Sequence, residues 1–191
     1  MRDSLAFALL AALWLGWFAY WLAAARNVKA TSRREGIATF LLNRIFVLIG
    51  ALLLVVPHQP LLWLNKRFVP QTMAAYWLGL LIVAAGLAVA VWARVHLGRN
   101  WSATVTIKQD HELIRTGPYG AVRHPIYTGI LLALLGTAVA IGEWRGLVAF
   151  VSFTVGLLIK IKAEERFMSE TFGEQYARYR AEVPALIPFI V

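Results

Sequence analysis

One polar stretch, residues 115–127, concentrates side chains that could bind a charged small molecule. It reads Arg-Thr-Gly-Pro-Tyr-Gly-Ala-Val-Arg-His-Pro-Ile-Tyr and lies just before an apolar run. A second polar cluster, further along the chain, contains Lys160, Glu164 and Glu165. Carboxylates and aromatic rings attract a sulfonium or ammonium group, whereas arginine, histidine and backbone N–H groups attract a carboxylate. Together the two clusters suit a ligand with both signs of charge, such as an amino-acid sulfonium.

The composition indicates that these clusters belong to a membrane protein. Apolar residues make up 60% of the 191 residues and charged residues only 15%, which lies outside the range of soluble globular domains. The net charge of +9 could indicate nucleic-acid binding. However, the basic residues lie between the apolar runs rather than on one face, which is typical of membrane topology. We therefore expect no nucleic-acid partner.

Metal chemistry is not expected. The sequence contains no cysteine, so it offers no disulfide, no thiolate nucleophile and no thiolate metal ligand. The histidines lack the i, i+4 spacing of a helical zinc site; they are His58, His96, His111 and His124. We expect no metal site.

Five apolar runs can form transmembrane helices. A helix needs about 20 residues to cross about 30 Å of hydrocarbon, and the runs lie at about residues 4–25, 37–57, 73–95, 125–142 and 146–162. The last run is short and ends in Lys160 and Lys162, so we expect the end of that helix to be polar. The sequence thus predicts an all-α integral membrane fold with five transmembrane helices in a single domain, residues 1–191.

The remaining polar segments, at residues 96–124 and 160–191, are expected to be the catalytic ones. Apolar and polar residues alternate around residues 103–108, which predicts a short extended piece. Charged and aromatic residues at three- and four-residue spacing over residues 163–180 predict a C-terminal amphipathic helix, with a possible break at Gly173.

The basic residues predict the orientation in the membrane. Most of the 19 Lys and Arg residues lie in a loop at residues 26–36, in residues 94–124 and from residue 160 onward. With five spans these segments share one side of the membrane, and the positive-inside rule places that side in the cytoplasm. We expect a cell inner or plasma membrane protein with its N-terminus outside and its C-terminus and active site, including a cofactor-binding loop, in the cytoplasm.

The order of motifs in the C-terminal half resembles a known family. Residues 111–127 read His-Glu-Leu-Ile followed by the stretch given above, and Glu164-Glu165 comes next. Residues 172–179 then read Phe-Gly-Glu-Gln-Tyr-Ala-Arg-Tyr, and Val-Pro follows at residues 183–184. This order strongly resembles the isoprenylcysteine carboxyl methyltransferase family over about residues 97–189, whereas the first two helices carry no such signal.

The resemblance implies an integral membrane enzyme that takes S-adenosylmethionine from the cytoplasm and leaves S-adenosylhomocysteine. Its methyl acceptor would be amphiphilic and drawn from the bilayer, most simply the carboxylate of a prenylated, isoprenylcysteine-like small molecule. We expect contact with membrane lipids and no obligate protein partner. By this likeness, the cofactor-binding residues are His111, Glu112, Leu113, Ile114, Tyr119, His124, Pro125, Ile126, Tyr127 and Glu164.

The catalytic group is expected to comprise Lys160, Glu164 and Arg123. Eukaryotic members of the family have an arginine on the substrate side where this chain has Lys160, which keeps the charge but loses the bidentate fork. We expect Lys160 to position an acceptor carboxylate rather than to act as an acid or base. A direct in-line displacement then requires mainly orientation and desolvation from the protein.

Three other functions remain open. A phospholipid amine head group is also compatible as the methyl acceptor. NADPH-dependent sterol or enone reductases look similar in this region, but their pattern Arg-His-Pro-Asn-Tyr-x-Gly-Glu has Asn and Glu where this chain has Ile126 and Ile130. A scaffold or lipid-binding protein without catalysis would have no affinity for S-adenosylmethionine.

Overall fold

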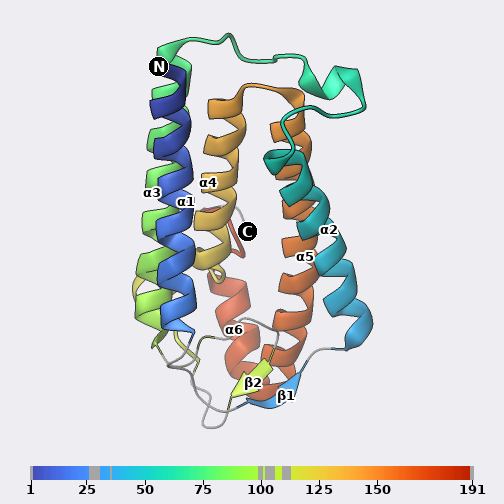
Figure 1. Ribbon diagram of the computed structural model, residues 1–191. Helices are drawn as coiled ribbons and strands as arrows, with labels where there is room; N and C mark the ends of the chain where they lie inside the picture. The colour runs from blue at the N-terminus through green and yellow to red at the C-terminus, as the bar shows by residue number, and fades with distance from the viewer. Residues whose placement is uncertain are drawn as a thin grey trace.

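The computed structural model describes residues 2–25, 31–34, 36–98, 101, 106–108 and 113–189. Long helices lie side by side along one axis, and a short helix lies at one end of the bundle (Figure 1). The helices are α1 Arg2–Ala24, α2 Ile37–Val55, α3 Met73–Leu97, α4 Pro125–Ile141, α5 Trp144–Phe172 and α6 Glu174–Glu182, with 3-10 turns η1 Leu62–Asn65 and η3 Gly117–Gly120. The first four helices begin and end within two residues of the predicted spans.

The long helices have the length and composition of membrane spans. In the part of the chain that the structure describes, α1, α2, α3 and α5 are long and apolar enough to cross a bilayer, and α4 is a shorter apolar helix. Many large apolar side chains on them are exposed, among them Leu15, Leu22, Leu48, Leu52 and Leu81. Such surfaces favour lipid over water. The chain is therefore an integral membrane protein, as its composition predicted.

Helices α3 and α4 form the most extensive helix contact, because glycines of both helices lie at their interface. Gly79 and Gly86 of α3 face Gly136 and Gly129 of α4. A Cβ on Gly86 would lie 2.5 Å from the carbonyl oxygen of Gly129, and a Cβ on Gly129 would lie 2.5 Å from that of Gly86. Small residues allow two backbones to approach closely in a membrane, where van der Waals contact drives helix association.

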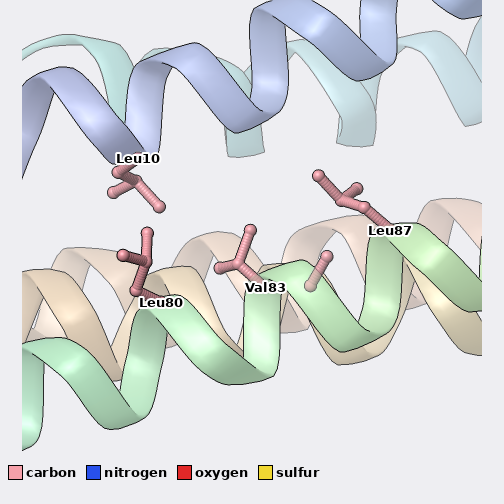
Figure 2. Packing of buried hydrophobic residues seen from close by; sticks show 5 residues of the cluster. Leu10, Leu80, Val83 and Leu87 are labelled. Carbon is pink, nitrogen blue, oxygen red and sulfur yellow. The ribbon is translucent and has the colours of Figure 1, made fainter.

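Helix α1 packs on the pair formed by α3 and α4. Leu10 of α1 faces Leu80, Val83 and Leu87 of α3 in a buried apolar cluster (Figure 2). Trp14 of α1 also donates a hydrogen bond from Nε1 to Thr137 Oγ1 of α4 at 3.0 Å. This bond gives the indole N–H a partner in apolar surroundings.

Helix α2 packs chiefly against α5, and two buried polar side chains join them. Asn43 Nδ2 donates to the carbonyl of Gly156 at 2.8 Å, and Ser152 Oγ donates to the carbonyl of Phe46 at 2.7 Å. Each bond gives a hydrogen-bond partner to a buried polar side chain and to a backbone carbonyl of the other helix. The two bonds fix the pairing of α2 with α5.

Arginines satisfy carbonyl groups at the C-terminal ends of three helices. Arg145 Nη1 donates to three carbonyls at the end of α2. Arg94 donates from Nη1 and Nη2 to the carbonyls of Gly98 and Ala24, each at 2.7 Å, at the ends of α3 and α1. The last carbonyls of a helix have no partner within it, and a cation also complements the helix dipole there.

Helix α5 differs from the prediction. It continues through Lys160 to Phe172 without interruption, so the prediction of a separate helix beginning at residue 163 is wrong. No glycine or proline occurs between Gly156 and Gly173, and the Lys, Glu, Ala and Met residues of this stretch favour helix. The predicted break at Gly173 is confirmed, since its φ is +49° and α6 begins at the next residue.

The fold also contains a small antiparallel sheet, which the all-α prediction omitted. Strands β1 Thr31–Arg34 and β2 Thr106–Lys108 pair with each other and lie at the end of the bundle that carries α6 (Figure 1). Strand β2 confirms the predicted extended piece over residues 106–108, while residues 102–105 lie outside the described part. Strand β1 lies in a predicted loop, because its polar sequence has no alternation and its partner is distant in the chain.

Replacing Gly86 by leucine is expected to destabilise the protein strongly, because the new side chain has no room between α3 and α4. Overpacking of this kind costs about 1–3 kcal/mol or more, and the thermal midpoint in detergent should fall accordingly. Gly16→Leu is the matched control, since nothing lies within 4 Å of the position of a Cβ on Gly16. Equal midpoints for both variants would contradict the close packing of α3 on α4.

Candidate active site

Two segments that are far apart in the sequence meet at the polar end of the bundle, the end that carries α6 and the sheet. Tyr127 lies in the first turn of α4, and its hydroxyl donates to Glu164 Oε1 of α5 at 2.5 Å. His124 is the residue that precedes α4, and its Nδ1 lies 3.6 Å from Glu164 Oε2. The structure therefore brings together the two clusters that the sequence predicted to share a ligand.

Local sequence explains why these side chains converge. Pro125 begins α4, where its fixed φ suits a helix and its missing N–H needs no partner. On α5, Lys160 and Glu164 are four residues apart and so share one helix face. Lys160 Nζ lies 5.5 Å from the centroid of the Tyr127 ring, which is a cation–π distance. Tyr127 thus contacts both charged residues of this face.

Glu165 binds Arg123 instead of facing solvent. Arg123 donates to Glu165 Oε1 from Nη2 at 2.7 Å and from Nε at 2.9 Å. The two side chains are only 8% and 12% exposed. Arg123 Nη1 also donates to the carbonyls of Arg180 and Val183, so one guanidinium links α5 to the C-terminal segment.

His124 lies between two carboxylates. Its Nδ1 faces Glu164, and its Nε2 lies 3.3 Å from Glu165 Oε1. Burial alone would lower the pKa of His124, but the hydrogen bonds and charges of Glu164 and Glu165 outweigh burial and raise the pKa above its ordinary value. The ring is also stacked on Tyr127, with centroids 5.6 Å apart. The two carboxylates therefore favour the imidazolium form of His124.

The C-terminal segment runs beside the beginning of α4. The backbone N–H groups of Arg123 and His124 donate to the carbonyls of Pro184 and Ala185, at 2.8 Å and 3.0 Å. Thr128 Oγ1 donates to the following carbonyl at 2.7 Å. The carbonyl groups of residues 184–186 therefore hold the C-terminal segment beside the ionic network around His124.

An apolar wall adjoins the charged residues. Ile114, Tyr119 and Ile126 pack with Trp101 in one cluster, whereas Leu113 packs against the aromatic residues of α6. Burial is the main cause that raises the pKa of the Tyr119 hydroxyl above its ordinary value, so this side chain stays neutral. Trp101, Tyr119 and Ile126 are buried in this cluster, and Ile114 is half-buried at its border.

Two predicted cofactor residues, His111 and Glu112, lie outside the described part of the chain. The other predicted site residues lie at the polar end, where Leu113 packs against the aromatic residues of α6 and not with Ile114, Tyr119 and Ile126. Sequence reasoning did not include Glu165 in the site, because neighbouring carboxylates on a helix give no sign of which one meets an arginine. Among the described residues, no group of three or more His, Asp or Glu side chains could hold a metal ion.

These features define an integral membrane protein with a cluster of charged, partly buried side chains at one end of a helix bundle. The sequence profile of a family described as phospholipid methyltransferase matches residues 74–175, from the beginning of α3 to the beginning of α6. The chain belongs to this family of membrane methyltransferases, which confirms the predicted class of enzyme.

Individual relatives agree with this assignment. The chain is 31% identical over 182 residues to a probable protein-S-isoprenylcysteine O-methyltransferase of Oryza sativa subsp. indica, a match that covers 90% of this chain and 88% of that protein. It is 36% identical over 107 residues to the protein-S-isoprenylcysteine O-methyltransferase of Schizosaccharomyces pombe (51% of this chain, 43% of that protein). It is also 31% identical over 115 residues to the cobalt-zinc-cadmium resistance protein CzcN of Cupriavidus metallidurans (59% and 51%). The predicted resemblance to isoprenylcysteine methyltransferases is confirmed.

The pH dependence of stability tests the environment of His124. Because the folded-state pKa of His124 is raised above its ordinary value of 6.5, the protonated ring stabilises the fold fully below about pH 6.5. This contribution is lost as the pH rises through the folded-state pKa. We expect the thermal midpoint to fall as the pH is raised above about 6.5, and His124→Gln to lose most of this fall. His58→Gln, at an exposed position after α2, should keep it; equal slopes for both variants would contradict the assignment.

Proposed function

We propose that the protein uses S-adenosylmethionine to methylate an amphiphilic acceptor from the bilayer, with its site at the polar end of the bundle. The hydrogen bond between Tyr127 and Glu164 supports this proposal most directly. It joins the two segments in which the sequence resembles isoprenylcysteine methyltransferases. The proposal therefore assigns one site to both segments.

The side chains present suit this cofactor. Glu164 offers a carboxylate that is 23% exposed, and Tyr127 offers an aromatic face, both of which attract ammonium and sulfonium groups. His124, whose ring nitrogens face Glu164 and Glu165, is proposed to hold Glu164 in place for the cofactor. Half-buried Ile114, which packs with Tyr119, is proposed to offer apolar surface to an adenine ring. The further cofactor-binding residues that we propose are His111, Glu112, Leu113, Pro125 and Ile126.

The protein's contribution to the reaction is orientation and desolvation. When bound, the cofactor supplies an activated methyl group. A carboxylate acceptor is already ionised at neutral pH, so the chain needs no general base for it. Lys160 is proposed to attract the acceptor carboxylate, while its contact with Tyr127 limits where its charge lies. Arg123, whose donors bind Glu165 and the C-terminal carbonyls, is proposed to position α4 against α5.

An isoprenylcysteine-like carboxylate is the acceptor that we propose. The rice and fission yeast relatives are named protein-S-isoprenylcysteine O-methyltransferases, and a cationic Lys160 favours an anionic acceptor. A phospholipid amine is the second candidate, because the family that matches is described as phospholipid methyltransferase. Such an amine would have to lose a proton before it is methylated, and Lys160 would repel its charged form.

The arrangement in the membrane is also a proposal. We infer that helices α1 to α5 all cross the bilayer within one domain. Helix α4 is shorter than the other four and packs along α3. Basic residues concentrate in the segments next to the polar end, so the positive-inside rule places that end and the C-terminus in the cytoplasm and the N-terminus outside.

Glu164→Gln is expected to weaken binding of S-adenosylmethionine by about tenfold or more, because a charge-assisted contact contributes about 1.5–3 kcal/mol. Isothermal titration of the detergent-solubilised protein measures this change. Glu170→Gln is the control, since Glu170 lies further along the same helix and binds Arg166 at the surface. A wild-type protein that gives no response up to about 1 mM cofactor would refute the proposed function.

The acceptor class is tested with radiolabelled S-adenosylmethionine. We expect label to enter an S-farnesylcysteine derivative with a free carboxylate but not its carboxamide, because the amide has no ionised oxygen to methylate. Lys160→Met should raise KM for the free acid by about tenfold, the effect of losing one charged contact. Label that enters endogenous phospholipid instead, with no response to the cysteine derivative, would establish the amine acceptor.

A further inference from the structure

An exposed histidine of α3 covers the turn η3, which lies outside the ionic network described above. His96 is in the last turn of α3. A Cβ on Gly117 would lie 2.7 Å from His96 Cε1 and 2.9 Å from both ring nitrogens, so the imidazole lies face-on against Gly117. The φ of Gly117 is +59°, a left-handed conformation that favours glycine. The backbone and the histidine ring therefore both require glycine here.

The hydroxyl of Thr116 binds His96 instead of capping its own turn. Thr116 precedes η3, where a threonine hydroxyl commonly accepts a hydrogen bond from a backbone N–H two or three residues later. Its side chain makes no such bond. Thr116 Oγ1 instead lies 2.9 Å from His96 Nε2. The beginning of η3 is thus held by α3.

Tyr119 provides the third contact of His96. The two rings are stacked at 24° with centroids 6.3 Å apart. The Tyr119 hydroxyl donates to the carbonyl of Ala93 at 3.4 Å, about one turn before His96 on the same helix. The Tyr119 carbonyl accepts a hydrogen bond from Tyr179 at 2.6 Å. Tyr119, a cofactor-binding residue in the proposed function, is therefore fixed between α3 and α6.

We propose that His96 is a positioning residue that preorganises residues 116–119 for the cofactor, an inference that rests on the proposed function. His96 is exposed and lies outside the buried apolar clusters, so its removal leaves the helix bundle intact. A loosened turn must be ordered again when the cofactor binds, which weakens binding. The chemical step does not use His96, so KM for the cofactor changes while kcat does not.

The first test replaces His96 by alanine and by glutamine. His96→Ala should raise KM for S-adenosylmethionine and Kd for S-adenosylhomocysteine by about 3- to 10-fold, as expected for one lost hydrogen bond and a ring contact, with kcat and the thermal midpoint little changed. His96→Gln, which can still bind Thr116, should recover part of the affinity. His58→Ala is the control. Unchanged binding in His96→Ala, or a loss confined to kcat, overturns the proposal.

A double substitution tests the contact with Gly117. In the wild type, Gly117→Ala brings a methyl group against the His96 ring in addition to straining the backbone. In the His96→Ala background only the backbone strain remains. Gly117→Ala should therefore lower cofactor affinity by a smaller factor in the His96→Ala background than in the wild type. Equal factors in both backgrounds overturn the proposed contact.

Amide hydrogen exchange without any ligand separates this proposal from the proposed function. Residues 115–123 should exchange faster in His96→Ala than in His58→Ala, because the turn opens more often. Unchanged exchange overturns the ordering role of His96 even if the wild type binds S-adenosylmethionine. A wild type that does not bind the cofactor overturns the proposed function and the cofactor role of His96, while faster exchange would still show that His96 orders the turn.

Discussion

The contact between the backbones of α3 and α4 determines where the candidate site lies. Gly86 and Gly129 bring the two backbones into direct contact where these residues face each other, and shifting one helix along the other would bring larger residues into that space. Helix α3 ends next to His96, and α4 begins after His124. A fixed register between the helices therefore fixes the distance from the turn η3 to the first turn of α4. Tyr119 and residues 124–127, which are among the residues proposed to bind the cofactor, lie in these two places.

The continuous helix α5 combines an apolar part suited to lipid with a charged part that needs polar partners. Its first part is apolar and its last part carries Lys160, Glu164 and Glu165. Neighbouring residues of an α-helix point about 100° apart, so Glu164 reaches Tyr127 while Glu165 reaches Arg123. Glu164 is left partly exposed, whereas Glu165 is more deeply buried and paired with Arg123. A buried charge needs such a partner, because an unpaired one in this environment would be strongly destabilising.

The sequence predicted most of the helices and the meeting of the two polar segments for simple physical reasons. Uncharged runs of membrane-spanning length have few alternatives to helix, and alternating loops of a bundle share one side. The end of α5 was misjudged because hydropathy marks where apolar residues stop, whereas Gly173 ends the helix. The roles of Gly86 and Glu165 could not be predicted, since a glycine in an apolar run and one of two adjacent carboxylates do not reveal the partner that packing gives them.

The hydrogen bonds between residues 184–186 and the beginning of α4 are accepted by carbonyl groups of the C-terminal segment. These bonds come from the backbone and constrain the path of the segment, while burial of Val183 and Pro184 also restricts which side chains fit there. The ribosome makes these residues after α1 to α6. A chain in which α1 to α6 have formed but residues 184–186 have not yet been added thus lacks the carbonyl groups that accept hydrogen bonds from Arg123, His124 and Thr128.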